Sequence, residues 1–319
     1  MTDGGVITES GDGIQTVLEA LWRIPGFEAT RAGDFSLERQ GGLTNLVYKL
    51  DFGDGRRFIL RIPGKGTEDY IDREVELHNA RVAAQAGVSA EVIHGDAGTG
   101  VMMTRFIDGI VTMSPEQFRA RPGSPARAAR ALKQMHGCGQ EFRFRFELFA
   151  MIDDYLGILD KAKAELPEGY HAVVEAAQPV RTALDAHPAA LAPCHCDPLC
   201  ENFLDDGEKM WVVDWEYSGM NDPLWDLGDL SVEAGFDAAQ DAEMMAAYCG
   251  GAPSAAQMGR MVIYKAMCDL LWTLWGLIQH ANGNSAEDFW AYSVGRFERC
   301  QKLMNDPAFA GHVAAVKAG

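Results

Sequence analysis

The sequence is poor in basic residues. Its 319 residues include 28 Lys and Arg against 46 Asp and Glu, which gives a formal net charge of −18. Nucleic acids and anionic membranes are bound mainly by clusters of Lys and Arg, so we expect neither nucleic-acid binding nor stable membrane association. An acidic chain is compatible with a small cationic ligand.

A long apolar run and a secretion signal are also missing. The first 13 residues are polar and rich in glycine, without the basic start and apolar stretch of a signal peptide. The most apolar stretch, residues 267–278, contains Asp269 and is shorter than the roughly 20 residues that span a bilayer. We therefore expect a cytoplasmic protein.

Complete disulfide pairing is excluded, because the seven cysteines are odd in number. Cys194, Cys196 and Cys200 surround His195, and such a cluster invites comparison with zinc sites. The same segment carries a second pattern of polar residues, described below, which tetrahedral zinc ligation would distort. We therefore expect reduced thiols and interpret the three cysteines as incidental small residues.

The first third of the chain predicts a β-rich region. The Asp54-Gly55 pair indicates a hairpin between two alternating stretches, and Gly87 ends a helical one. The predicted strands are residues 35–40, 45–52, 57–62, 91–94 and 100–106, and the predicted helices are residues 14–22 and 71–86.

From about Ser114 onward the pattern becomes mostly helical. Asp222 followed by Pro223 indicates a helix start, with Asp as the N-cap. The predicted helices are residues 125–136, 149–164 and 170–187, and two short strands are predicted at 202–205 and 210–214. The best position for a hinge between the two regions is Asp108-Gly109.

The most informative motif runs from His195 to Asn202 and is followed by Asp214. Asp197 and Asn202 are five residues apart on a loop that leads into a short strand, and Asp214 ends the next strand. Phosphoryl transfer needs a carboxylate that accepts the hydroxyl proton and oxygen ligands that hold Mg²⁺ against the phosphates. The H-x-D-x-x-x-x-N pattern with a later Asp is typical of the kinase catalytic loop and metal-binding Asp.

Each of these residues has a plainer interpretation. Asp197 and Asp214 are compatible with ordinary solvated carboxylates, but Asp214 ends an apolar run, where a charge is costly without a partner. His195 lies in the predicted catalytic loop. A hydrogen bond that fixes the loop is the preferred role for it, ahead of acid–base chemistry.

After Asp214 the sequence resembles the choline and ethanolamine kinases. Residues 214–221 read Asp-Trp-Glu-Tyr-Ser-x-x-Asn and continue to Asp226, Gly228 and Glu233, similar to the D-x-E-Y … N … D … G … E signature of that family. Aminoglycoside phosphotransferases share the wider fold but typically lack the Glu-Tyr pair and the later Asn. The resemblance extends from about residue 41 to residue 297.

The resemblance implies an α+β, protein-kinase-like fold with two lobes. The β-rich N-lobe, residues 1–107, would bind the nucleotide, and the mainly helical C-lobe, residues 108–319, would carry catalysis and substrate binding. ATP and Mg²⁺ are the implied cofactors, and choline or ethanolamine is the implied acceptor. The oligomeric state is left open, a homodimer included. The implied roles are Asp197 as catalytic base, Asn202 and Asp214 as Mg²⁺ ligands, and Glu216 as an outer partner of the metal or a substrate contact.

On the nucleotide side, residues 41–45 resemble the family's short loop over the phosphates. Arg61 takes the place of the Lys that holds the phosphates in most kinases, with Lys49 as a competitor one strand earlier. Its acidic partner is expected to be Glu76, with Glu74 as the alternative. The predicted nucleotide-binding residues are Gly42, Thr44, Asn45, Arg61, Glu76, Arg105 and Ile107, the last two through backbone contacts with adenine.

On the substrate side, Asp226, Asp229 and Glu233 share one helical face, and the resemblance implies that Asp226 braces the catalytic loop. Quaternary ammonium groups have no N–H to donate and are bound by aromatic faces beside carboxylates. Trp272 and Trp275 match the W-x-x-W of choline kinases, although a core helix would give the same spacing. The predicted substrate residues are Glu216, Asp229, Glu233, Trp272, Trp275 and Tyr292.

One aromatic position of the family's cage differs. Direct register places Glu287 there, with Phe289 or Trp290 as candidate substitutes. The choice between choline and ethanolamine therefore stays open. Two further alternatives are a kinase of the same fold that acts on an aminoglycoside, homoserine or a sugar, and a pseudokinase. The complete set of Asp197, Asn202 and Asp214 argues against the pseudokinase.

Overall fold

The computed structural model describes residues 11–40, 45–64 and 71–319. The chain forms two compact units. The first comprises Met1–Ile110 and Val212–Tyr217, and the second comprises Val111–Trp211 and Ser218–Gly319. The lobe boundary after residue 107 stays a prediction. A short stretch of the later chain, Val212–Tyr217, belongs to the first unit, which the sequence pattern did not indicate.

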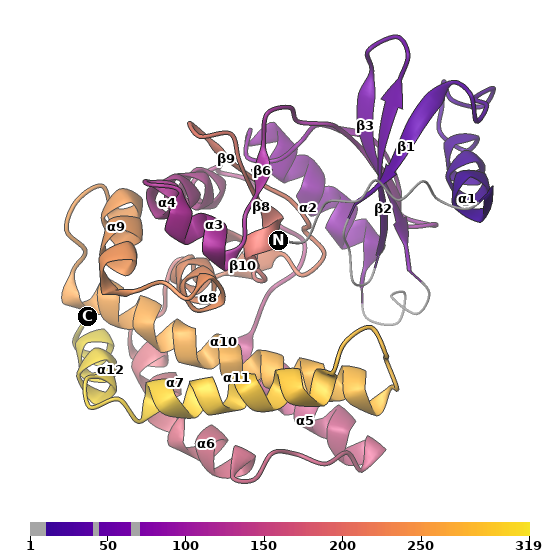
Figure 1. The fold of residues 1–319 in the computed structure, drawn as a ribbon. Coiled ribbons are helices and arrows are strands. Elements are labelled where there is room, and N and C mark those ends of the chain that lie inside the picture. The colour runs from indigo at the N-terminus through magenta and orange to yellow at the C-terminus, as the bar shows by residue number, and fades with distance from the viewer. Residues whose placement is uncertain (1–10, 41–44, 65–70) are drawn as a thin grey trace. The chain divides into compact units, whose positions relative to one another are not determined.

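The first unit is built on an antiparallel sheet with strand order β1-β2-β3-β5-β4, of which Figure 1 labels β1, β2 and β3. The hairpin between β2 and β3 turns at Asp54-Gly55 as predicted: Gly55 has a φ of 87°, and Asp54 Oδ1 accepts the Arg56 N–H at 3.0 Å. The five predicted strands are confirmed to within two residues. They are β1 (Phe35–Arg39), β2 (Asn45–Phe52), β3 (Arg57–Pro63), β4 (Val92–Asp96) and β5 (Val101–Arg105).

Two helices belong to the same unit, α1 (Gly11–Leu21) and α2 (Arg73–Gln85). Helix α1 buries Val17 and Leu21 in one hydrophobic cluster with side chains of the sheet. Helix α2 begins after Asp72, whose side chain accepts the N–H groups of the second and third residues of the helix. Both predicted helices are present, although α1 begins three residues before the predicted start at residue 14.

The second unit is mainly helical. Its 27-residue helix α10 packs against α5, α8, α11 and α12 (Figure 1). The close crossing of α8 and α10 depends on Gly228, where a Cβ would lie 2.6 Å from the Met261 carbonyl oxygen. The helices are α3 (Pro115–Ala120), α4 (Ser124–His136), α5 (Leu148–Ala162), α6 (Tyr170–Ala176), α7 (Gln178–Ala186), α8 (Leu224–Ala234), α9 (Ala238–Cys249), α10 (Ala255–Ala281), α11 (Phe289–Met304) and α12 (Phe309–Ala318).

Helix α10 is long and apolar enough to cross a membrane when only length and composition are considered. However, 78% of its most apolar window is buried inside the protein. Burial on most sides is the pattern of a core helix, which is apolar because it is surrounded by other helices.

Short strands frame the loop that follows residue 194. Strand β7 (Ala192–Cys194) pairs antiparallel with β10 (Gly219–Asn221). A separate three-stranded sheet has the order β6-β8-β9. Its strands are β6 (Val111–Thr112), β8 (Phe203–Asp205) and β9 (Met210–Val212).

Four sequence predictions past Val111 need correction. The strand predicted over residues 210–214 ends at Val212, so Asp214 lies beyond the strand. The single helix predicted over residues 170–187 is two helices, α6 and α7. Pro179 lacks the N–H that would continue the helical ladder, which accounts for the break. The strand predicted from Asn202 begins one residue later, because Asn202 ends a 3₁₀ turn over Cys200–Asn202. The helix predicted to start with Asp222 as its N-cap begins one residue later, because Pro223 is the N-cap of α8; the Asp222 side chain still accepts the Leu224 N–H at 3.0 Å.

Candidate active site

The loop after β7 is held in an uncommon backbone conformation. Cys196, directly before Asp197, has a φ of 68°, a left-handed value that is costly for a residue with a Cβ. The Asp226 carboxylate accepts the backbone N–H groups of His195 at 2.7 Å and of Cys196 at 2.8 Å. The Trp225 indole N–H donates to the Cys196 carbonyl at 2.9 Å. These bonds from α8 hold the loop in place, as the resemblance implies for Asp226.

Asp226 itself is fully buried, and its carboxylate also contacts the His136 ring. His136 Nε2 lies 2.9 Å from Asp226 Oδ2, and His136 Nδ1 lies 2.8 Å from the Tyr248 hydroxyl. A buried carboxylate is tolerated when its oxygens are hydrogen-bonded, and Asp226 meets this condition. His195, 1% exposed, contributes its backbone N–H to the arrangement, and any part that its ring plays in catalysis stays a prediction.

Asp197 and Asn202 lie together in the second unit. The Asn202 amide nitrogen donates to the Asp197 backbone carbonyl at 3.1 Å, so the amide oxygen is the atom directed elsewhere. Burial is the main reason for raised pKa values at three neighbouring groups, and the charge of Asp197 adds to the rise in each. These groups are Tyr155, whose pKa is raised to about 12, Asp229 and Tyr292. Side chains from α5, α8 and α11 therefore share one electrostatic environment with Asp197.

The first unit contains a connected group of charged side chains around Glu76 and Glu216. Arg61 forms ion pairs with Glu76 and, at 3.4 Å, with Asp214. The Asn45 amide donates to Glu216 at 3.3 Å. The acid beside Arg61 is therefore Glu76. The alternative, Glu74, is exposed, and the competing cation Lys49 pairs with Glu38 at 3.3 Å.

The electrostatics of this group suit ligands of both signs. The surrounding protein excludes water from the Asp214 carboxyl and so raises its pKa. Nevertheless, 39% of the Asp214 side chain is exposed and open to a ligand. Burial and the charge of Asp214 raise the pKa of Glu216 to about 7. Arg61 Nε and Nη2 are buried and have no hydrogen-bond partner within the described residues, so both can donate to an anion.

A divalent cation fits the acidic side of the group. Glu76, Asp214 and Glu216 each offer a carboxylate oxygen, and these oxygens lie within 4.8 Å of one another. Mg²⁺ prefers hard oxygen ligands of this type. Asp214 has a left-handed φ of 68°, a backbone conformation that is costly for a residue other than glycine.

Four predicted nucleotide residues remain. Gly42 and Thr44 lie outside the described residues. The Arg105 backbone N–H donates to the Glu91 carbonyl at 2.9 Å, and its guanidinium pairs with the Glu91 carboxylate at 2.7 Å. These bonds engage the Arg105 backbone N–H, and both predicted backbone contacts with adenine stay predictions.

The aromatic side chains predicted to form a cage lie together on α10 and α11. The rings of Trp272 and Trp275 are 6.4 Å apart at 88°, and Trp275 lies 5.9 Å from Tyr292. Phe289 completes the cluster, with its ring 5.6 Å from Trp275. Trp290 instead contacts His280, and Glu287 is exposed, so Phe289 is the candidate substitute that lies beside Trp275, and its part in a cage stays a prediction.

The two acids predicted beside the cage differ in their pairing. Glu233 forms ion pairs with Arg296 at 2.7 Å and with Arg299 at 3.3 Å. Asp229 is 1% exposed, and its Oδ2 accepts the Trp272 indole N–H at 3.3 Å. Its Oδ1 has no hydrogen-bond partner among the described residues. Burial, with the charges of Glu233 and Asp197, raises the pKa of Asp229 well above its usual range.

The cysteines next to the catalytic loop are buried and unreactive in character. Burial raises the pKa values of the Cys194, Cys196 and Cys200 thiols. Cys194 lies near His136 and Asp226, but both of these already hydrogen-bond to other groups. The geometry agrees with small buried residues rather than a zinc site.

Comparison with known proteins decides the family. The profile of the phosphotransferase enzyme family matches residues 37–258. The crystal structure of a choline/ethanolamine kinase family protein from Mesorhizobium loti is 60% identical, with a TM-score of 0.87, over 96% of this chain and 99% of that one. The protein belongs to the choline/ethanolamine kinase family.

Two further solved structures support the assignment. The choline kinase LicA from Streptococcus pneumoniae is 28% identical over 84% of this chain and 93% of its own, with a TM-score of 0.71. A LicA structure in complex with AMP is 27% identical over 87% and 92% of the two chains, with a TM-score of 0.68. The predicted protein-kinase-like phosphotransferase fold is thereby confirmed for this kinase.

Proposed function

We propose that this kinase transfers the γ-phosphoryl group of Mg·ATP to the hydroxyl of choline or ethanolamine. The observation that carries the proposal is Asp229. A carboxylate that is 1% exposed, with one oxygen left without a partner among the described residues, is unfavourable unless a cation joins it. The ring of Trp272 next to it, with Trp275 beside Trp272, suits an ammonium group with little or no hydrogen-bonding capacity.

The proximity of Asp229 to the predicted base supports an amino alcohol as acceptor. The charge of Asp197 adds to the raised pKa values of both Asp229 and Tyr292. An acceptor whose ammonium lies at Asp229 would carry its hydroxyl only two carbons away. We propose that Asp197 takes the proton of this hydroxyl as its oxygen attacks the γ-phosphorus and ADP leaves.

The nucleotide side of the proposal rests on Arg61 and its neighbours. Arg61 Nε and Nη2 would donate to phosphate oxygens, since a guanidinium offers a rigid fork for such groups. We propose Asp214 and Asn202 as the residues that hold Mg²⁺, with Glu216 near it. When bound, the ion neutralises charge on the transferring phosphoryl group.

Glu233 takes a different role from the one expected from its sequence position. Two arginines already balance its charge, so we propose that it orients the pocket and that Asp229 provides the counter-charge to the ammonium. A cytoplasmic location also stays a proposal. It is supported by the seven cysteines, each of which is free.

A coupled assay of ADP release tests the function. It would compare choline, ethanolamine, homoserine and kanamycin as acceptors, with a reaction without acceptor as the reference. We expect choline or ethanolamine to give the highest kcat/KM. Faster turnover with homoserine or kanamycin, or ADP release that ignores the acceptor, would overturn the proposal.

A further inference from the structure

An arginine that the sequence motifs did not single out joins two acids of the first unit. Arg73 is the first residue of α2, and its side chain is 9% exposed. Its Nη1 lies 2.8 Å from Glu76 Oε2 and 3.4 Å from Glu216 Oε2. Because Glu76 also pairs with Arg61, the two arginines and two glutamates form a continuous chain of ion pairs.

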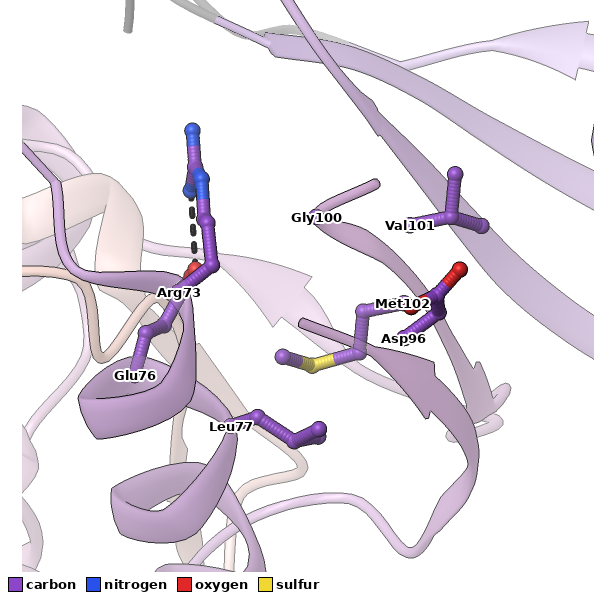
Figure 2. Close-up of a pocket in the computed structure, with 7 residues that line it drawn as sticks. All are labelled: Arg73, Glu76, Leu77, Asp96, Gly100, Val101 and Met102. Atoms are coloured by element: carbon purple, nitrogen blue, oxygen red, sulfur yellow. Dashed lines mark hydrogen bonds and ion pairs between the residues drawn. The ribbon is translucent and has the colours of Figure 1, made fainter. Parts of the chain in front are cut away.

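The fold makes room for this side chain. Gly100 stands just before β5, on the wall opposite α2, with a φ of +69°. A Cβ at this position would lie 2.5 Å from Pro63 Cγ and 3.1 Å from Arg73 Nε. Figure 2 shows Arg73 and Glu76 on α2, facing the strand segment from Gly100 to Met102 across a small pocket. Glycine at position 100 therefore permits the position that Arg73 occupies.

Helix α2 also holds the Val212–Tyr217 segment at its other end. The Val212 N–H donates to the Val88 carbonyl at 2.8 Å, just beyond the C-terminus of α2. The Trp215 indole N–H donates to the Ser89 hydroxyl at 3.2 Å. The bond from Arg73 to Glu216 is the attachment near the N-terminus of the helix. Asp214 lies between these attachments along the chain.

We propose that Arg73 is a positioning residue for phosphoryl transfer, which acts by fixing Glu76 and Glu216 and through them Arg61 and Asp214. The inference rests on the proposed roles of Arg61 and Asp214 in binding the nucleotide and its metal. Without Arg73, Glu76 would draw Arg61 more strongly toward itself and away from phosphate. Glu216 would also lose the cation that separates its charge from that of Asp214.

Two substitutions at Arg73 separate its donors from its packing. Arg73→Met keeps an unbranched apolar stem and loses the donors, whereas Arg73→Lys keeps one charged nitrogen. The readout is Kd for a fluorescent ATP analogue with Mg²⁺, measured well below the Tm of each variant. We expect Arg73→Met to raise Kd about tenfold, as for loss of a charge-assisted hydrogen bond, and Arg73→Lys to stay within about threefold of the parent.

A steric variant tests the same idea without a change at Arg73. Gly100→Ala crowds Arg73 and Pro63, whereas Gly55→Ala, also at a positive φ, meets nothing within 4 Å. The two share a backbone penalty and differ in the crowding. We expect Gly100→Ala to raise Kd for the ATP analogue about fivefold or more beyond any effect of Gly55→Ala, because a shift of the guanidinium weakens both ion pairs.

The outcomes distinguish this inference from the proposed function. If Arg73→Met lowers Tm but leaves Kd within about twofold, Arg73 is merely structural and the inference is wrong. Nucleotide binding needs no acceptor, so the expected Kd pattern would support the role of Arg73 even if neither amino alcohol were phosphorylated. A parent protein that does not bind ATP would overturn both proposals.

Discussion

The buried acidic groups of the two units have different neighbouring side chains. In the first, the carboxylates of Glu76, Asp214 and Glu216 face the guanidiniums of Arg61 and Arg73. In the second, Arg296 and Arg299 both pair with Glu233 and Asp269, while Asp229 contacts an indole N–H instead of a cation. In each of these two groups, three carboxylates stand beside two arginines.

The difference between the regions indicates which ligand each can take. Buried charge is costly without compensation, so an acid in excess marks a place where a positive ligand is favoured. In the first unit the excess lies beside Arg61 donors that have no hydrogen-bond partner in the described part of the chain, which suits a metal ion together with phosphates. In the second it lies beside aromatic rings, which suits an ammonium group.

The largest effect is expected from loss of the metal-binding acid. Asp214→Ala should lower kcat by about 10³-fold or more, because charge on the transferring phosphoryl group would no longer be neutralised by a well-placed ion. Titration of turnover with Mg²⁺ checks this, with the exposed Asp54→Ala in the same unit as the control. An unchanged Mg²⁺ dependence in Asp214→Ala would show that Asp214 is not a ligand.

A somewhat smaller loss is expected at the base. Asp197→Asn should lower kcat by about 10²–10⁴-fold while Kd for the nucleotide stays near that of the parent, since only proton transfer is impaired. Single-turnover kinetics with saturating ATP measure the step. Glu201→Gln, an exposed acid in the same loop, is the matched control. Near-normal turnover in Asp197→Asn would exclude it as the base.

The aromatic region is expected to respond at the level of KM. Trp275→Ala should raise KM for choline about thirtyfold, corresponding to a desolvated cation–π contact of about 2 kcal/mol. The rise for ethanolamine should be smaller, because its ammonium can still donate hydrogen bonds to carboxylates. Trp290→Ala, which removes an indole that contacts His280, is the control. A lower Tm with unchanged KM values would identify Trp275 as a core residue.

A smaller effect is expected from pH. Choline has a fixed charge, and its binding favours ionised Asp229, whose pKa is raised above the ordinary 3.8. Below that raised pKa, KM for choline should fall by up to about tenfold for each unit rise in pH. The free energy of unfolding without ligand should also decrease as pH rises through this window, because the folded protein holds the proton more tightly than the unfolded chain.

Asp229→Asn should abolish the pH dependence of KM, since the titrating group is gone. Choline KM values measured from about pH 5 to about pH 9 in the parent and the variant test this. A flat profile in the parent protein would contradict the raised pKa.

Much of the first unit follows from local pattern. Alternation of apolar residues predicts β2 and β3, and the Asp54-Gly55 turn sets their register. Strands β7 and β10 could not be predicted in the same way, because each is three residues long and they pair across 25 or more positions of the chain. Such short strands are stabilised by what surrounds them, and local propensity is too weak to indicate them.

The candidate site was predictable where a motif fixes the spacing, and less so where partners are distant. Asp197, Asn202 and Asp214 stand out from spacing alone. The link from Arg73 to Glu216 spans 143 positions and has no local pattern. The choice of Phe289 over Trp290 depends on how α11 is rotated, which packing decides. The pairing of Glu233 with two arginines likewise needed the structure.

The central claim is that nucleotide and amine depend on separate charged groups, one in each unit. KM values for ATP and for choline, measured on Arg61→Lys and Asp229→Asn, test it most directly. We expect Arg61→Lys to raise KM for ATP about tenfold, as a fork of donors is lost, and to leave KM for choline within about twofold. Asp229→Asn should raise KM for choline about tenfold and leave KM for ATP within about twofold. Variants that raise both constants equally, or that exchange these effects, would contradict the claim.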